Sequence, residues 1–148
     1  MLLQKQPTRW SCLPTAFAMA MNKPVVEIFK AIGHDGSEIL FPALEEPQNR
    51  RAFHIAECIR AAYMAGYAVT QFEVHPILSP DGIHTVDFEI IPPFKMTSFG
   101  VATGRPLGKF LRHAVAFEGT TAYDPNGKQF DLRNQFRVDC YFVFDLIL

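Results

Sequence analysis

The pattern of apolar and polar residues predicts helices in the first part of the chain. Between Ser11 and Asn22 the apolar residues recur every three or four positions, which places them on one face of a helix. These residues are Leu13, Ala16, Phe17, Ala20 and Met21. Ser11 precedes the first turn and is expected to cap the helix. A second helix is predicted from Pro24 to a stop at Gly33.

A long loop, a third helix and a strand are predicted next. Residues 34–50 contain two prolines and the turn-forming pair Asp35-Gly36, so we expect a loop there. The third helix is predicted to end at Gly66, and one of its faces is apolar. That face consists of Ile55, Ile59, Ala62 and Tyr63. Residues 67–74 then change to a composition typical of strands.

From about residue 75 the pattern changes to short strands and turns. Residues 84–91 alternate apolar and acidic positions until Pro92-Pro93 ends the predicted strand. Residues 94–111 contain three glycines without a clear period, and we expect them to form a mobile flap over a site. Further strands are predicted at 113–119, 121–127 and 138–146. Helices followed by an antiparallel sheet predict an α+β fold.

Composition limits the size of the protein and its partners. The 148 residues are 49% hydrophobic and 20% charged, which is enough for one core, so we expect a single domain over residues 1–148. Basic and acidic residues number 14 and 15 and are scattered, so nucleic acid is not an expected partner. The segment MLLQKQ is too short and too polar for a signal peptide. No nearby apolar run approaches the roughly 18 residues of a membrane span, so no membrane partner is expected.

The cysteines and histidines predict neither disulfides nor a metal site. The chain has an odd number of cysteines, namely Cys12, Cys58 and Cys140, and none of them has C-x-x-C spacing. This favours a reducing compartment and a cytoplasmic protein. No two histidines have the spacing of a helical zinc site. Cys58 lies beside the predicted apolar face of the third helix. Cys140 shares a predicted strand face with Val138 and two phenylalanines. We interpret Cys58 and Cys140 as buried packing residues.

Cys12 is the candidate nucleophile. It lies in the first turn of the predicted helix, where the positive end of the helix dipole favours a thiolate over a thiol. A single cysteine is more often a small buried hydrophobic residue, so its position alone does not establish chemistry.

A nucleophilic cysteine needs a base that a third group holds in place, and His113 is the candidate base. If Gly119-Thr120 forms a two-residue turn, Val115 pairs with Asp124. His113, Asp124 and Asn126 then share one face, with Asp124 diagonal to His113 and Asn126 opposite. Either side chain can orient the imidazole. The simpler interpretation is that the segment Asp-Pro-Asn-Gly merely forms a turn.

Gln6 is a candidate for stabilising an oxyanion. Acyl transfer places negative charge on the carbonyl oxygen of the substrate, and donors must meet it. A side-chain amide six residues before Cys12 can join the backbone N–H of the nucleophile in this role. An exposed polar residue near a terminus also needs no special function.

These residues resemble the papain-like cysteine peptidases, and most of all their small bacterial and phage branch related to the double-glycine leader peptidases. That branch has Gln, five residues, then Cys, often followed by Pro-Thr-Ala and a helix, and this chain has QPTRWSCLPTA. The branch later has a His that opens a strand and an Asp-Pro that closes the next one, here HAVAF and YDPNG. Many leader peptidases have an acidic residue and a glycine on the two sides of the cysteine, where this chain has Ser11 and Leu13.

The resemblance implies a papain-like fold with N-terminal helices packed on a C-terminal antiparallel sheet. It implies Cys12 as nucleophile, His113 as general base, Asp124 as the residue that orients it, and Gln6 in the oxyanion hole. The expected function is a cysteine peptidase or isopeptidase that cleaves amide bonds of a peptide or protein through an acyl-enzyme, without a cofactor. The alternative is a catalytically silent binding module that grips a partner protein through the same groove. The sequence predicts no oligomeric state.

Overall fold

A computed structural model of the protein describes residues 1–74, 77–78, 85–86, 97–109 and 111–147. In this part of the chain, three helices are followed by an antiparallel sheet. The first helices are α1 (Cys12–Ala20), α2 (Val25–Ile32) and α3 (Ile55–Met64). The main sheet contains β1 (Tyr67–Glu73), β4 (Phe99–Pro106), β5 (His113–Glu118), β6 (Thr121–Asp124), β7 (Lys128–Asp131) and β8 (Phe136–Leu146). A short helix, α4 (Leu132–Gln135), connects β7 to β8, and β2 (Ile77–Leu78) pairs with β3 (Thr85–Val86).

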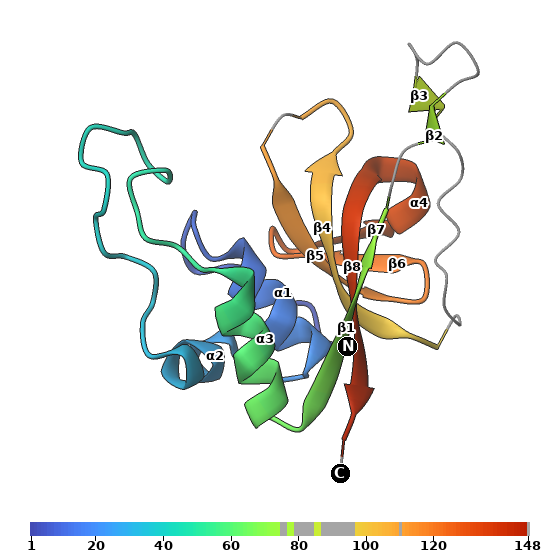
Figure 1. Cartoon of the computed structure of the whole chain (residues 1–148), viewed down its shortest axis with the longest axis horizontal. Coiled ribbons are helices and arrows are strands. Elements are labelled where there is room, and N and C mark those ends of the chain that lie inside the picture. Colours follow the sequence, from blue (N-terminus) through green and yellow to red (C-terminus); the bar gives the residue numbers. More distant parts are fainter. Residues whose placement is uncertain (75–76, 79–84, 87–96, 110, 148) are drawn as a thin grey trace.

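The sheet has the spatial order β1-β8-β4-β5-β6-β7, and all of its neighbouring strands are antiparallel. Helices α1, α2 and α3 lie together on one side of it (Figure 1). The predicted α+β architecture, with N-terminal helices packed on a C-terminal antiparallel sheet, is therefore confirmed. Among the described residues, no helix has the length and apolar character that a membrane crossing requires.

Helix α1 lies at the centre of the core. Every residue from position 14 to position 20 is buried, because the sheet packs on one side of the helix and the other helices pack on its opposite side. The Phe17 ring contacts the rings of Phe142 and Phe144 of β8, at centroid distances of 6.5 and 5.3 Å. The predicted cap is wrong in one respect: Ser11 stands at the N-cap position, but its side chain makes no capping hydrogen bond.

The other two helices depart from their predictions in detail. Helix α2 begins one residue after Pro24 and ends at Ile32, and its C-cap Gly33 has the left-handed conformation (φ 99°) that favours glycine. The predicted apolar face of α3 is wrong only at Tyr63, which is 68% exposed, because Ala62 is buried and Ile55 and Ile59 pack against the core. The buried residues of α3 are Cys58, Ala61 and Ala62. These small side chains belong to the same buried core as α1, whereas the prediction gave more weight to large apolar residues.

Strand β4 corrects the prediction of a mobile flap at 94–111, because residues 99–106 form a strand between β8 and β5. A Cβ atom added to Gly100 would lie 1.9 Å from the carbonyl oxygen of Phe142, and one added to Gly104 would lie 2.0 Å from that of Arg137. These glycines therefore permit a close approach of β8, although glycine in sequence indicated a loop. Residues 94–96 and 110, and most of the strand predicted at 84–91, lie outside the described residues.

A β-bulge in β8 inverts the side-chain alternation of this strand. Thr103 pairs with Cys140, but Gly104 pairs with Val138, so Asp139 has no partner in β4. Cys140 consequently faces the helices, whereas Val138 belongs to the second core on the other side of the sheet. The prediction that Val138 and Cys140 share a face is wrong, because it assumed strict alternation. Cys140 is nevertheless buried as predicted, at 7% exposure.

Candidate active site

Cys12 is the first residue of α1 and is partly exposed at the end of an otherwise buried helix. The first turn of α1 contains no acidic side chain, so no carboxylate of that turn opposes the positive end of the helix dipole near the thiol. Because α1 packs against β5, its N-terminus lies beside the start of that strand, where His113 is the first residue.

The β5–β6 hairpin brings His113 and Asp124 together. Glu118 pairs with Thr121 across the two-residue turn, as predicted from the sequence. The His113 Nε2 atom lies 2.7 Å from the Asp124 Oδ1 atom. Asp124 is only 6% exposed, and the same oxygen also accepts a hydrogen bond from the backbone N–H of Asn126 at 2.9 Å. The carboxylate is thus fixed on two sides.

Asn126, the other candidate for orienting His113, has a different environment. Its side-chain oxygen accepts a hydrogen bond from the backbone N–H of Lys128 at 3.0 Å, which closes the turn after β6. Among the described residues, the structure gives His113 a hydrogen bond to Asp124 and none to Asn126. The geometry therefore favours Asp124 of the two.

The surroundings of His113 change its protonation. Burial alone would lower the pKa of the imidazole, but its hydrogen bond to Asp124 and its interactions with the neighbouring Cys12 raise the pKa to about 9. Since Nε2 is used by Asp124, Nδ1 is the ring nitrogen left for the thiol. At neutral pH this raised pKa keeps the ring protonated, so a positive charge lies beside Cys12.

The other two thiols have environments that suppress reactivity. Burial raises the pKa of the Cys58 thiol far above its ordinary range, and burial also raises the pKa of the Cys140 thiol. Thiolates are the nucleophilic form of cysteine, so neither residue is suited to attack a substrate. Cys12 is the cysteine that combines exposure with an imidazole neighbour.

Gln6 lies between the turn after β6 and the start of α1. Its backbone N–H donates to the carbonyl oxygen of Pro125 at 2.7 Å, and its side-chain Nε2 donates to the carbonyl oxygen of Thr8 at 2.7 Å. Among the described residues it has no hydrogen bond to Cys12, His113 or Asp124. The structure thus brings Cys12, His113 and Asp124 together and places Gln6 in the loop that precedes Cys12.

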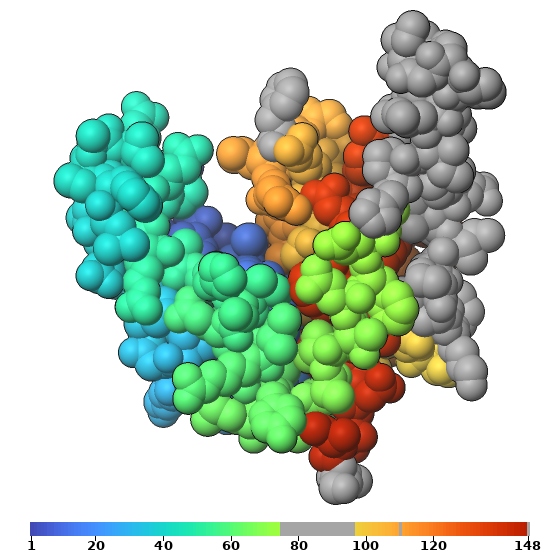
Figure 2. Space-filling model, in the orientation of Figure 1, coloured from blue at the N-terminus to red at the C-terminus, as the bar shows by residue number. Residues whose placement is uncertain are grey.

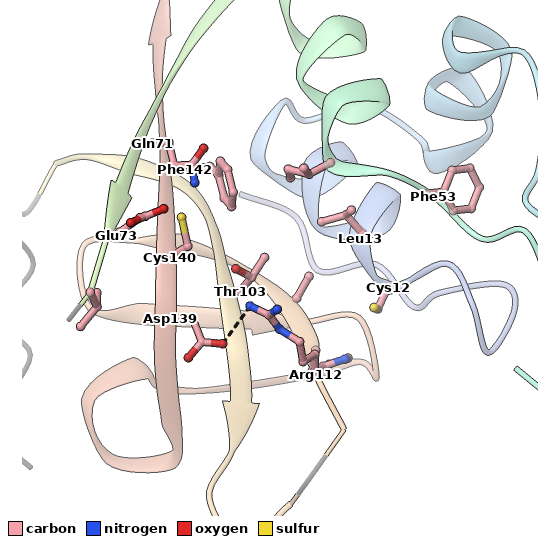
Figure 3. Close-up of a pocket in the computed structure, with 14 residues that line it drawn as sticks. Cys12, Leu13, Phe53, Gln71, Glu73, Thr103, Arg112, Asp139, Cys140 and Phe142 are labelled. Atoms are coloured by element: carbon pink, nitrogen blue, oxygen red, sulfur yellow. Dashed lines mark hydrogen bonds and ion pairs between the residues drawn. The ribbon is translucent and has the colours of Figure 1, made fainter. Parts of the chain in front are cut away.

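A cleft of about 610 Å³ opens beside Cys12 and His113. It corresponds to the hollow between the helices and the strands in the space-filling view (Figure 2). The close-up shows its walls, which come from α1, the start of α3 and strands β1, β4, β5 and β8 (Figure 3). An elongated substrate therefore has room to lie across the sheet with a carbonyl group at Cys12.

The lining of this cleft also contains charged residues that were not predicted from the sequence. The Arg112 Nη2 atom lies 3.0 Å from the Asp139 Oδ2 atom, an ion pair that reaches across β4 (Figure 3). Glu73 lines the β1 side. The position of Arg112 directly before His113 could have indicated that Arg112 lies at the site. The direction of Asp139 depends on the β-bulge, which no sequence pattern indicated.

Cys12 also borders a second hollow of about 280 Å³, on the side of the loop at 34–54. Its lining includes Trp10 and Phe53. The Trp10 Nε1 atom donates to the carbonyl oxygen of Asp35 at 3.0 Å, and the guanidinium of Arg50 lies over the Trp10 ring at 4.8 Å from its centroid. The predicted long loop is confirmed, and these contacts hold it against the start of α1.

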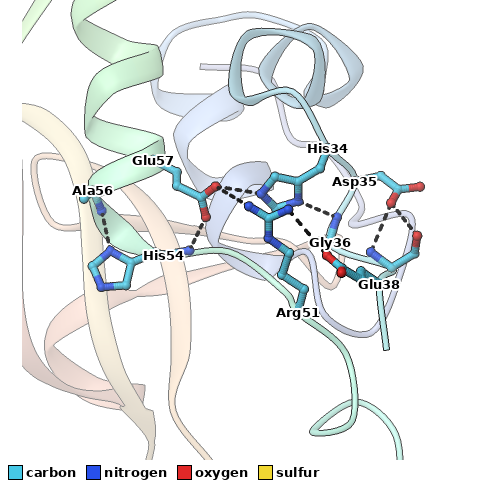
Figure 4. A network of polar contacts seen from close by, with 9 residues as sticks. His34, Asp35, Gly36, Glu38, Arg51, His54, Ala56 and Glu57 are labelled. Atoms are coloured by element: carbon cyan, nitrogen blue, oxygen red, sulfur yellow. Dashed lines mark hydrogen bonds and ion pairs between the residues drawn. The ribbon is translucent and has the colours of Figure 1, made fainter. Parts of the chain in front are cut away.

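A polar network fixes the base of this loop to α3 (Figure 4). The His34 Nε2 atom lies 2.7 Å from the Glu57 Oε2 atom, and the His34 ring stacks on Phe53 at 5.0 Å. Burial alone would raise the pKa of Glu57, but hydrogen bonds from the His54 N–H and from His34 hold this pKa below its ordinary value. Among the described residues no cluster of side chains is suited to hold a metal ion.

The helices packed on this antiparallel sheet are consistent with the papain-like fold that the sequence resemblance predicted. No protein-family model matches the sequence, and no curated protein matches it. Among solved structures, the chain is similar to the peptidase domain of Streptococcus ComA, a bifunctional ABC transporter involved in a quorum-sensing pathway. The match has a TM-score of 0.54 and 11% sequence identity, and it covers 99% of this chain and 98% of that one. At this identity the likeness concerns the fold.

Proposed function

We propose that this protein is a cysteine peptidase or isopeptidase that cleaves amide bonds through Cys12, His113 and Asp124. The observation that carries the proposal is that Cys12 and His113 line the same cleft of about 610 Å³ and that the His113 Nε2 atom lies 2.7 Å from the buried Asp124 carboxylate. The shared fold with a peptidase domain also supports this class of activity.

The first half of the proposed reaction forms an acyl-enzyme. The Cys12 thiolate attacks the carbonyl carbon of the scissile amide, a C–S bond forms, and the carbonyl electron pair moves to oxygen. The backbone N–H of Cys12 and the Gln6 amide stabilise this oxyanion. When the intermediate collapses, the C–N bond breaks and the His113 imidazolium gives its proton to the leaving amine.

The second half releases the product. The neutral imidazole takes a proton from water, the resulting hydroxide attacks the thioester, and the C–S bond breaks to restore the thiolate. Asp124 holds the ring in place throughout and stabilises its positive charge whenever the ring is protonated. If an amine replaces water, the same acyl-enzyme gives transfer instead of hydrolysis.

Turnover of amide substrates separates this proposal from a binding module with the same fold. We expect the protein to release aminomethylcoumarin from members of a fluorogenic peptide-amide library. Release should decline as the pH rises through about 9, because His113 then loses the proton that the leaving amine needs. A library without any cleaved member, together with no acetyl adduct on Cys12 after treatment with p-nitrophenyl acetate, would favour the binding module.

A further inference from the structure

We infer that Ser11 is a positioning residue that holds the Gln6 side chain in place for oxyanion stabilisation. The inference rests on the proposed function, because an oxyanion forms only if Cys12 attacks a carbonyl group. Ser11 is a polar residue with 0% exposure, and it immediately precedes the nucleophile. Its hydroxyl makes no capping hydrogen bond to the helix that follows and donates instead to the Thr8 carbonyl oxygen.

The Ser11 hydroxyl makes three hydrogen bonds, and all of them go to Thr8. Its Oγ atom accepts from the Thr8 backbone N–H at 3.1 Å and from the Thr8 hydroxyl at 2.8 Å. The same hydroxyl donates to the Thr8 carbonyl oxygen at 3.0 Å. A hydroxyl has one donor and two acceptor sites, so these bonds use its full capacity. The arrangement fixes both peptide groups of Thr8.

The carbonyl oxygen of Thr8 is also the anchor of Gln6. The Gln6 Nε2 atom donates to it at 2.7 Å. One N–H of the amide is thereby held, and among the described residues the second N–H has no hydrogen-bond partner. An amide with one N–H fixed and the other available is a preorganised donor, which is what oxyanion stabilisation requires. Ser11 therefore connects the start of α1 to the orientation of Gln6.

Removal of the Ser11 hydroxyl should release this anchor. The N–H and hydroxyl of Thr8 would lose their acceptor, and the Thr8 carbonyl would lose one donor. The loop from Gln6 to Ser11 would then relax, and the Gln6 amide would no longer be directed to one position. The Cys12–His113–Asp124 contacts involve none of these groups, so formation of the thiolate should not change.

Two reactions of Cys12 distinguish these effects. Acylation by p-nitrophenyl acetate passes through an oxyanion, whereas alkylation by iodoacetamide requires the thiolate and no oxyanion. The rates of both reactions are measured for wild type, Ser11→Ala, Gln6→Ala and the double variant. Thr15→Val is the matched control, because Thr15 is equally buried and its hydroxyl donates to the Ser11 carbonyl at 2.7 Å without contacting Thr8.

We expect Ser11→Ala to slow acylation by about tenfold or more and to leave the alkylation rate within about twofold of wild type. Thr15→Val should change neither rate by more than about twofold, and Ser11→Ala should add little once Gln6 is alanine. If Ser11→Ala does not fold, Thr8→Val removes one of the three bonds and should give a smaller loss of acylation with unchanged alkylation.

Three results would overturn the inference while the proposed function stands. The first is an unchanged acylation rate in Ser11→Ala, and the second is an equal loss of the acylation and alkylation rates in that variant. The third is a double variant whose loss of acylation rate equals the product of the losses in Ser11→Ala and Gln6→Ala. A wild-type protein that p-nitrophenyl acetate does not acylate at Cys12 would overturn the proposed function as well.

Discussion

Replacement of Cys12 by alanine is expected to abolish the acyl-enzyme and to lower amide turnover by a factor of about 10⁴ or more, because no other described thiol can attack the substrate. Burial raises the pKa values of the Cys58 and Cys140 thiols, so neither is a substitute nucleophile. The measurement is intact-protein mass spectrometry after p-nitrophenyl acetate treatment, followed by peptide mapping, together with turnover of the best library substrate.

Cys58→Ala is the matched control for this experiment. Cys58 is fully buried on α3 and takes part in the helical core, so its loss should cost about 1 kcal/mol of stability and leave acylation in place. Acylation that persists in Cys12→Ala, or that disappears in Cys58→Ala while the protein remains folded, would contradict the assignment of Cys12.

Replacement of Asp124 by alanine is expected to lower turnover by about a thousandfold, because the His113 ring loses the group that orients it and stabilises its positive charge. The same change should lower the pKa of His113 from about 9, since the hydrogen bond to Asp124 raises it. An NMR titration of the His113 ring in wild type and variant measures this shift directly. Asn126→Ala is the control, and it should leave the His113 titration unchanged, because its side chain contacts Lys128 instead.

The raised pKa of His113 also predicts how stability depends on pH. The pKa of His113 is higher in the folded protein than its ordinary value of 6.5, so protonation of His113 contributes its full stabilisation of the fold at pH values below 6.5. This contribution is lost as the pH rises through about 9. The difference in the free energy of unfolding between wild type and Asp124→Ala should therefore narrow between these two pH values. A difference that grows over this range would show that the pair does not stabilise a protonated His113.

The sequence predicted the β5–β6 hairpin and the start of α1 because short-range rules determine them. A two-residue turn at Gly119-Thr120 fixes the register of its strands, and this register places Asp124 within reach of His113. The apolar spacing after Ser11 likewise fixed the helix that begins at Cys12. These two elements contain most of the candidate site, so local patterns were sufficient to predict it.

The remaining features depend on contacts between segments that are distant in the sequence. The strand at 99–106 was missed because its glycines permit close approach of β8, a requirement visible only once β8 lies beside them. The β-bulge at Asp139 and the exposed position of Tyr63 have the same origin in tertiary packing. The hydrogen bonds of Ser11 to Thr8 were missed because a serine before a helix usually caps it.

The reactivity of Cys12 as a function of pH tests the central claim most directly, because the proposed mechanism needs an imidazolium that favours the thiolate. We predict that iodoacetamide labels Cys12 rapidly and selectively at mildly acidic pH, where a free thiol with a pKa of about 8.5 is almost unreactive. His113→Ala should slow this labelling by about tenfold or more. Labelling of Cys12 no faster than that of a free thiol, and unchanged in His113→Ala, would contradict the account.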